Sequence, residues 1–321
     1  MATITRLYGW DCGNTMIPAA DGSLVITSTY KKTGGYAVRD NAATARMPAG
    51  GVANPSASFW VYPRDPWSYS ASIWGVRFDL STGENIALRW DSTNKTFDAY
   101  VDGVKVADGT IIVPSNDWFH VQFYVVIADA GSIQVKIDGK LSIDYSGDTQ
   151  PGAAAVANYF TIYNNVSSYV YYDDLAIGYG GFLGDIRCID IRPSADTAQD
   201  DWTPSAGDNY STIDETPPSD ADYNETNVDA QADELALGDF DGVTYNPVAV
   251  TAWVRAQMLA ATGDSIKVGI DSGGTDDVTE HALSTTWQYY FHTADLNPAD
   301  AAEWEDADID ALLLRYESVI A

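Results

Sequence analysis

Short runs of alternating apolar and polar residues, separated by turn residues, cover most of this 321-residue chain. The clearest run lies over 118–126 and 132–145, where Ile133, Val135 and Ile137 fall on one face with a period of two. Such a period is typical of strands that bury one face and expose the other. The pattern therefore predicts a long β-hairpin with a single buried face.

Other parts of the first half show the same alternation of apolar and polar residues. Asp102-Gly103 and Asp138-Gly139 directly follow alternating apolar residues, and Asp-Gly pairs adopt the positive φ that tight hairpin turns need. Many short strands with turns between them are typical of an antiparallel sandwich. Further strands are predicted over 58–63, 72–79, 85–91 and 96–103.

The stretch 171–192 is interpreted as a joint between two β-domains. It contains the last strand of the first domain, several glycines, and an alternating run over 185–193 that predicts the first strand of the second domain, ending at Pro193. About 180 residues precede the joint and about 140 follow, so each part is long enough to bury its own core. We therefore predict a jelly roll over 1–181 and an acidic β-domain over 182–321. Asp173-Asp174 are interpreted as polar residues at a strand end, not as a catalytic pair.

The second domain is expected to be another β-sandwich with one short helix. Residues 194–233 are rich in Asp, Ser, Thr, Pro, Asn and Gly, and are too long for an ordinary connection. They predict an irregular loop that is either packed or functional. Asn297-Pro298 precedes an acidic run, which predicts a helix with Asn297 as its N-cap. Strands are predicted over 248–259, 265–271, 286–295 and 311–319.

The formal charge of −29 is unevenly distributed along the chain. Residues 1–181 hold 12 Lys and Arg against 17 acids, a net −5, whereas residues 182–321 hold 5 against 29, a net −24. Residues 193–254 contain fourteen acids and no Lys or Arg. This surface would repel phosphate backbones and anionic lipid, so neither nucleic acid nor a membrane is an expected partner. A basic excess at residues 31–46, which include Arg46, fits either a docking patch or an ordinary mixed surface.

The cysteine content and the N-terminal residues indicate the cellular compartment in which the chain is made. Cys12 and Cys188 are too few for a disulfide framework and lack metal-ligand spacing, so both are expected to be free thiols. The first residues show no basic segment followed by an apolar run, and no stretch reaches the roughly 18 apolar residues of a membrane helix. We expect synthesis in the cytoplasm without a signal peptide or a membrane anchor.

Several motifs carry a resemblance to known families. SFWVYP (58–63), DWFHVQF (117–123) leading into IQVKIDG (133–139), and YVYYDDLAIG (169–178) resemble concanavalin A-like, laminin G-like jelly rolls. FLGDIRCIDIRPSAD, DDWTPSAGDNYSTIDETPPSDADY and NPADAAEWEDADIDAL are similar to a block that follows such a domain in virion proteins of tailed bacteriophages. The resemblance implies a structural protein on the virion surface, made in the host cytoplasm and bound to other capsid or tail proteins. It also implies a homo-oligomer, with trimers favoured at three-fold positions.

Three functions remain open. The first is a virion structural protein that decorates the capsid, forms a spike or belongs to the tail. The alternative is a host-receptor or glycan-binding adhesin, as in a tail fibre or receptor-binding protein, and the third is a polysaccharide-degrading enzyme. The chain shows no long repeats or heptads typical of fibre shafts, which favours a compact decoration protein or spike.

The distribution of carboxylates argues against hydrolytic chemistry. Glycoside hydrolysis commonly uses two carboxylates that flank the scissile bond. Residues 1–181 contain one glutamate, Glu84, and their aspartates lie mainly at predicted turns. His120 alternates with apolar residues inside a predicted strand and is interpreted as structural. We therefore predict that the chain is not an enzyme.

Two candidate ligand sites follow from the loops. Trp67 and Tyr69 lie in a loop bracketed by prolines, where an aromatic ring either stacks on a sugar or folds back onto the sandwich edge. Oxygen-rich loops make calcium a candidate ligand, although the EF-hand pattern is missing and free surface carboxylates are the alternative. No other cofactor is predicted. The candidate calcium ligands are Asp239, Asp241, Asp271, Asp276 and Asp277.

Overall fold

The computed structural model describes residues 2–8, 19–21, 25–28, 30–32, 37–40, 44–64, 74–153, 155–164, 169–215, 218–239, 246–261 and 263–321. These residues form antiparallel sheets and one short α-helix, α1 (Asp306–Asp310), so the prediction of an all-β fold is confirmed. None of the described helices is long and apolar enough to cross a membrane. The chain divides into two compact units, Met1–Ile189 (unit 1) and Asp190–Ala321 (unit 2).

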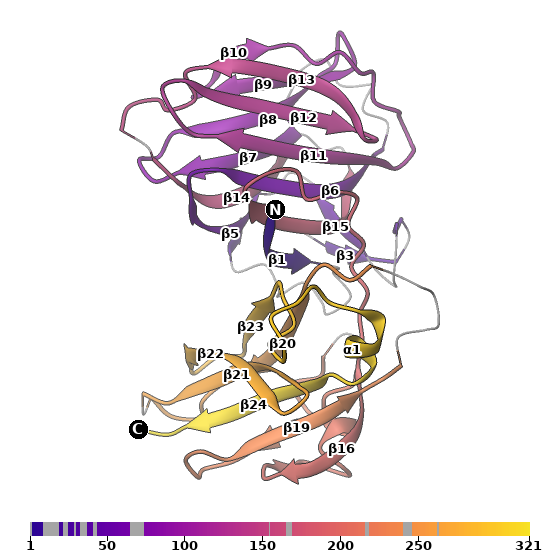
Figure 1. Ribbon diagram of the computed structural model, residues 1–321, viewed down its shortest axis with the longest axis vertical. Coiled ribbons are helices and arrows are strands. Elements are labelled where there is room, and N and C mark those ends of the chain that lie inside the picture. Colours follow the sequence, from indigo (N-terminus) through magenta and orange to yellow (C-terminus); the bar gives the residue numbers. More distant parts are fainter. Residues whose placement is uncertain are drawn as a thin grey trace. The chain divides into compact units, whose positions relative to one another are not determined.

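Unit 1 consists of two antiparallel sheets that face each other, drawn in indigo to magenta in Figure 1. Sheet A has the order β13-β12-β11-β6-β15-β4-β3, with β1 also paired to β15. Its strands are β1 (Thr3–Tyr8), β3 (Val25–Thr27), β4 (Ala37–Asp40), β6 (Pro55–Pro63), β11 (Phe119–Val126), β12 (Gly131–Ile137), β13 (Lys140–Gly147) and β15 (Val170–Tyr179).

Sheet B has the order β10-β9-β8-β7-β14-β5-β2. Its strands are β2 (Ala19–Asp21), β5 (Thr44–Val52), β7 (Trp74–Leu80), β8 (Asn85–Asp91), β9 (Thr96–Val101), β10 (Val104–Ala107) and β14 (Ala157–Asn164).

Aromatic side chains from both sheets fill the space between them. The rings of Phe78 on β7 and Phe123 on β11 lie 4.9 Å apart, and those of Phe59 on β6 and Phe160 on β14 lie 5.8 Å apart. All four side chains are buried. Burying a side chain of this size contributes about 1.5–3 kcal/mol, so the period-two face seen in the sequence is the face that forms the core.

The segment Phe182–Ile189 follows β15 and belongs to unit 1. It forms no strand, and β16 (Pro193–Asp200) begins at the proline where the predicted strand 185–193 was to end, so that prediction is wrong. Side chains on the outer face of sheet A bond the backbone of this segment in place of a neighbouring strand. Gly184 N donates to Gln122 Oε1 (3.0 Å), and Ser58 Oγ donates to Gly184 O (2.6 Å).

Asp173 and Asp174 do not end a strand, so that interpretation is also wrong. Both are fully buried at an irregularity within β15, where Asp174 has a φ of 50°. Their carboxylates accept backbone hydrogen bonds: Asp173 Oδ2 from Lys32 N (2.7 Å) and Asp174 Oδ1 from Cys188 N (2.9 Å). The two side chains therefore fix segments that lie over the sheet.

Unit 2 contains a five-stranded sheet of order β16-β19-β24-β21-β22, drawn in rose-pink (β16) to yellow in Figure 1. A two-stranded ribbon of β20 and β23 contributes Ala252 and Tyr290 to the same hydrophobic core as Val268 and Leu314 of the sheet. The strands are β16, β17 (Thr203–Pro204), β18 (Asn224–Glu225), β19 (Ala232–Leu237), β20 (Val250–Ala256), β21 (Ser265–Ser272), β22 (Thr275–Ala282), β23 (Gln288–Ala294) and β24 (Leu313–Val319).

The helix of unit 2 begins later than predicted. Glu305 is the N-cap of α1, and a capping box joins it to Asp308. The predicted N-cap, Asn297, is instead buried, and its Oδ1 accepts hydrogen bonds from Ser272 Oγ (2.8 Å) and Ala299 N (3.0 Å). Asn297 therefore bonds both the local backbone and a neighbouring strand, but the α-helix begins only at Asp306.

Candidate functional site

The outer face of sheet B gathers basic and aromatic side chains from five neighbouring strands. On β7, Val76 and Phe78 point into the core, so Arg77 and Asp79 project from the opposite face. The strand register places Thr161 of β14 between Arg77 and Arg46 of β5. We call this set the arginine–tyrosine face; its members are Arg46, Arg77, Asp79, Arg89, Tyr100, Tyr159, Thr161 and Tyr163.

Each arginine of this face lies over a tyrosine ring. The guanidinium carbon of Arg89 is 4.3 Å from the ring centre of Tyr100. The corresponding distances are 5.2 Å for Arg46 over Tyr159 and 5.4 Å for Arg77 over Tyr163. Cation–π pairs of this kind hold the planar groups against one another, so rings and guanidinium groups are presented together across the sheet.

Asp79 links two of the three arginines. Its Oδ1 lies 2.6 Å from Arg77 Nε, and its Oδ2 lies 3.1 Å from Arg46 Nε. Thr161 Oγ1 donates to the same Oδ2 at 2.6 Å. Asp79 is 6% exposed whereas the Arg46 side chain is 47% exposed, so a buried carboxylate anchors side chains that extend to the surface.

Tyr163 adds a buried hydroxyl beside Arg89. Burial raises the pKa of Tyr163, against the lowering effects of Arg89 and Arg77. Within the described residues, the Tyr163 hydroxyl has no acceptor for its proton. It lies over Gly75, where any Cβ would come 3.0 Å from this oxygen and 2.0 Å from Leu88 O, so a larger residue does not fit there.

The arrangement offers hydrogen-bond donors and aromatic surface over a long stretch. Five strands spaced at the usual interval span roughly 19 Å, a length that accommodates several linked sugar rings. Sugars bind proteins by stacking on aromatic rings and by hydrogen bonds from polar side chains. Tyr159 is 40% exposed and supplies such a ring at the surface.

The predicted sugar-binding residues Trp67 and Tyr69 lie outside the described residues. Of the predicted calcium ligands, Asp241 also lies outside them, and Asp239 is exposed. Asp277 lies 3.0 Å from His292 Nε2 and does not join the other aspartates. Among the described residues, Asp271 and Asp276 are therefore the predicted calcium ligands that lie near each other.

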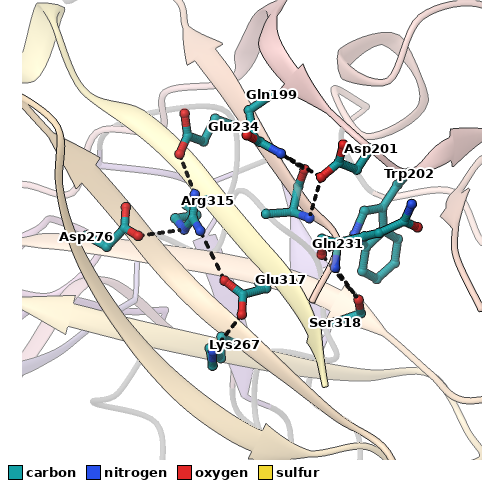
Figure 2. A network of polar contacts seen from close by, with 11 residues as sticks. Gln199, Asp201, Trp202, Gln231, Glu234, Lys267, Asp276, Arg315, Glu317 and Ser318 are labelled. Carbon is teal, nitrogen blue, oxygen red and sulfur yellow. Dashed lines mark hydrogen bonds and ion pairs between the residues drawn. The ribbon is translucent and has the colours of Figure 1, made fainter. Parts of the chain in front are cut away.

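Asp271 and Asp276 do come together, and Glu234 joins them. One carboxylate oxygen from each lies within 4.8 Å of the others, which gives a cation three oxygen donors. Figure 2 shows Arg315 of β24 reaching two of these groups: its Nε lies 3.1 Å from Asp276 Oδ2, and its Nη1 contacts Glu234. The guanidinium already supplies positive charge here, and calcium binding stays a prediction.

Only part of the arginine–tyrosine face could be recognised from the sequence. Arg77 and Arg89 occupy outward positions of predicted strands, and Arg46 belongs to the basic excess at residues 31–46. The alternation of Arg77 and Arg89 with core residues is visible in the sequence and predicts that they face outward. Their meeting on one face depends on the strand order β5-β14-β7-β8, which brings distant segments together.

No protein-family model matches this chain, and no curated protein matches it. Among solved structures, it is similar to alginate lyase Aly36B, with 13% identity, a TM-score of 0.43, and coverage of 55% of this chain and 97% of that one. It is also similar to domain 4 of AbnA, a GH43 extracellular arabinanase from Geobacillus stearothermophilus, in complex with arabinotriose. Here the identity is 18%, the TM-score is 0.43, and the match covers 56% of this chain and 94% of that one. A carbohydrate esterase from the Shiga toxin-encoding bacteriophage phi24B is similar at 15%, with a TM-score of 0.43 and coverage of 56% and 100%. At such identities the likeness concerns the fold.

The prediction that the chain is not an enzyme is wrong. The similar structures include an alginate lyase, an endo-β-1,4-glucuronan lyase from Trichoderma reesei and the phage carbohydrate esterase, all enzymes that act on carbohydrates. The prediction considered only the carboxylate pair of glycoside hydrolysis. Other carbohydrate chemistry does not depend on that pair.

Proposed function

We propose that unit 1 binds a polysaccharide through the arginine–tyrosine face. The observation that supports this is the set of three stacked pairs, Arg46 with Tyr159, Arg77 with Tyr163, and Arg89 with Tyr100. Tyr159 offers an exposed ring on which a sugar can stack, and each pair presents a guanidinium that donates to hydroxyl or acidic oxygens. The pairs lie on adjacent strands, so one chain of linked sugars meets all of them.

Tyr159 provides the sharpest test because the chain offers a matched control. Tyr159 is 40% exposed on this face, and Tyr179 is 39% exposed at the end of β15, which belongs to sheet A. We expect Tyr159→Ala to weaken polysaccharide binding at least tenfold, and Tyr179→Ala to leave it unchanged. Titration calorimetry against a panel of acidic and neutral polysaccharides measures both. Equal losses in the two variants would contradict the assignment of the face.

Incubating each polysaccharide with the chain tests whether bound polymer is also cleaved. Size-exclusion chromatography of each polysaccharide after incubation shows whether its length falls. A shortened polymer adds an activity to the proposed binding, and an intact polymer leaves binding as the function of the face.

We also propose that the chain is a surface component of a tailed phage particle, where unit 1 attaches to a host glycan. The support is the sequence resemblance of the blocks in unit 2 to virion proteins. On this proposal the chain is an oligomer in the head or the tail. Quantitative staining of purified particles against the major capsid protein tests it: hundreds of copies indicate capsid decoration, a handful indicate the tail, and none contradicts the proposal.

A further inference from the structure

We infer that the polysaccharide is anionic, with a carboxylate on its repeating sugar, and that Asp79 is the positioning residue that orients two guanidinium groups toward it. The inference rests on the proposed function and deepens it by naming the class of ligand. It depends on which nitrogen atoms of Arg46 and Arg77 already contact Asp79, and on the net charge of the arginine–tyrosine face.

Asp79 contacts both arginines through their Nε atoms. Arg77 Nε lies 2.6 Å from Oδ1, and Arg46 Nε lies 3.1 Å from Oδ2. The Nη groups of these two arginines have no acceptor among the described residues. A guanidinium presents five N–H donors, and its terminal fork matches the two oxygens of a carboxylate. The face therefore presents two guanidinium groups whose Nη donors are available to a ligand.

The charge of the face is positive although the chain is strongly acidic. Arg46, Arg77, Arg89 and Lys105 carry four positive charges, and two of them are compensated by Asp79 and by Asp98, which lies opposite Arg89 and pairs with Lys105. A neutral glycan would leave this excess unmatched, whereas carboxylates spaced along a polymer would neutralise it. Since the chain carries −29 overall, a polyanion approaches it favourably only where positive charge is concentrated.

Tyr163 packs beside the guanidinium group of Arg77. Its side chain is nine-tenths buried, and its hydroxyl proton has no acceptor in the described part of the chain. The register pairs Gly75 with Arg89 and Ala87 with Arg77, so small residues lie beside both arginines. The hydroxyl is buried, so Tyr163 acts by packing against the arginines and not by contacting the sugar itself.

The test compares polymers that differ in the carboxylate alone. Alginate, polygalacturonate and hyaluronan are each compared with their esterified or carboxyl-reduced forms, at two salt concentrations, by calorimetry on the full chain. We expect at least one acidic polymer to bind at least tenfold more tightly than its neutral partner, with an affinity that falls as salt rises. Equal binding to both members of every bound pair, or binding of neutral polymers alone, overturns the inference and leaves the proposed function standing. Binding to no polymer overturns both.

Variants separate positioning from folding. Asp79→Asn is expected to reduce the preference for the acidic polymer at least fivefold, because the forks of Arg46 and Arg77 lose their common anchor. Asp144→Asn is the matched control: it makes the same change at an exposed position on β13, which belongs to sheet A. A loss of fold in Asp79→Asn would weaken both polymers equally, so an unchanged ratio of the two affinities contradicts the positioning role.

Discussion

Arg77 Nε lies 2.6 Å from Asp79 Oδ1, two residues farther along the same strand. Residues i and i+2 of a strand share a face, so this contact is local. The other oxygen of Asp79 accepts from Arg46 of β5 and Thr161 of β14, which are distant in sequence. One carboxylate therefore joins three strands on the outer face of sheet B.

Removing this carboxylate should destabilise the fold. In Asp79→Ala, the buried hydroxyl of Thr161 loses its acceptor, and Arg46 and Arg77 lose their counter-charge. We expect the free energy of unfolding to fall by about 1–3 kcal/mol. Urea denaturation followed by circular dichroism measures the change. Asp129→Ala, at an exposed turn, is the control and should change the value by less than about 0.5 kcal/mol.

His120 should make stability depend on pH. It is 3% exposed, its Nε2 lies 2.7 Å from Ser58 Oγ, and burial lowers its pKa to about 4, with Asp185 raising and Arg187 lowering it. The native state therefore favours the neutral ring. Above about pH 7 the ring is neutral in both states, but between about pH 6.5 and 4 the unfolded state gains protons and stability is lost, by about 2–3 kcal/mol at pH 4.5.

The comparison of variants isolates this histidine from the many carboxylates that titrate in the same range. We expect His120→Gln to lose less stability than the native chain between pH 7.5 and 4.5, by denaturant unfolding at both values. His281→Gln, in unit 2, is the control and should keep the native difference. If His120→Gln shows the full native loss, the buried ring is not its source.

The core of unit 1 could be predicted because its signals are local. Alternation places Ile133, Val135 and Ile137 on the buried face of β12, as their spacing indicated. Asp102 and Asp138 adopt φ values of 45° and 46°, the left-handed values that tight turns require. Each of these features depends on a few consecutive residues, so a single sequence contains them.

The candidate site depends on contacts that a single sequence does not reveal. Arg46 and Arg77 meet because β14, more than 75 residues after β7, pairs with both β5 and β7. The segment 185–193 alternates like a strand, but Gln122 and Ser58 of sheet A bond the backbone of the adjoining Gly184. In both cases tertiary partners, not local preference, decide the outcome.

Asp233 holds the long acidic loop of unit 2, so its removal should be costly. It is fully buried and accepts hydrogen bonds from Tyr316 Oη (2.6 Å), Asn209 Nδ2 (2.8 Å) and Trp202 N (2.9 Å). Burial raises its pKa, although these hydrogen bonds lower it. We expect Asp233→Ala to reduce the free energy of unfolding by about 3–5 kcal/mol, because three buried donors lose their acceptor.

The pH dependence gives an independent check on Asp233. A carboxyl whose pKa is raised in the native state favours folding below its unfolded value, and that contribution is lost as pH rises through the native value. Asp233→Asn should therefore show a smaller gain in stability on acidification from neutral pH than the native chain. Asp295→Ala, at an exposed position, is the control for both measurements, which use urea unfolding. A loss under about 1 kcal/mol in Asp233→Ala would contradict the role of this residue.

Arg315 should compete with calcium in unit 2. Its guanidinium contacts Glu234, Asp276 and Glu317, as Figure 2 shows, and its side chain is 14% exposed. We expect Arg315→Met to reduce the free energy of unfolding by about 1–3 kcal/mol, because the carboxylates then repel one another. Calcium should restore part of this loss in the variant, since the three carboxylate oxygens then lack a counter-ion.

In the native chain, calcium should change stability little, because the Arg315 guanidinium already provides a counter-charge to Glu234 and Asp276. Thermal unfolding with calcium and with a chelator measures this in both chains. Lys267→Met is the matched control: it removes a positive charge that pairs with Glu317 at 2.6 Å but leaves Arg315 in place, so calcium should not rescue it. A large calcium-dependent rise in the native chain would contradict the competition, and would instead support Asp271 and Asp276 as ligands beside the arginine.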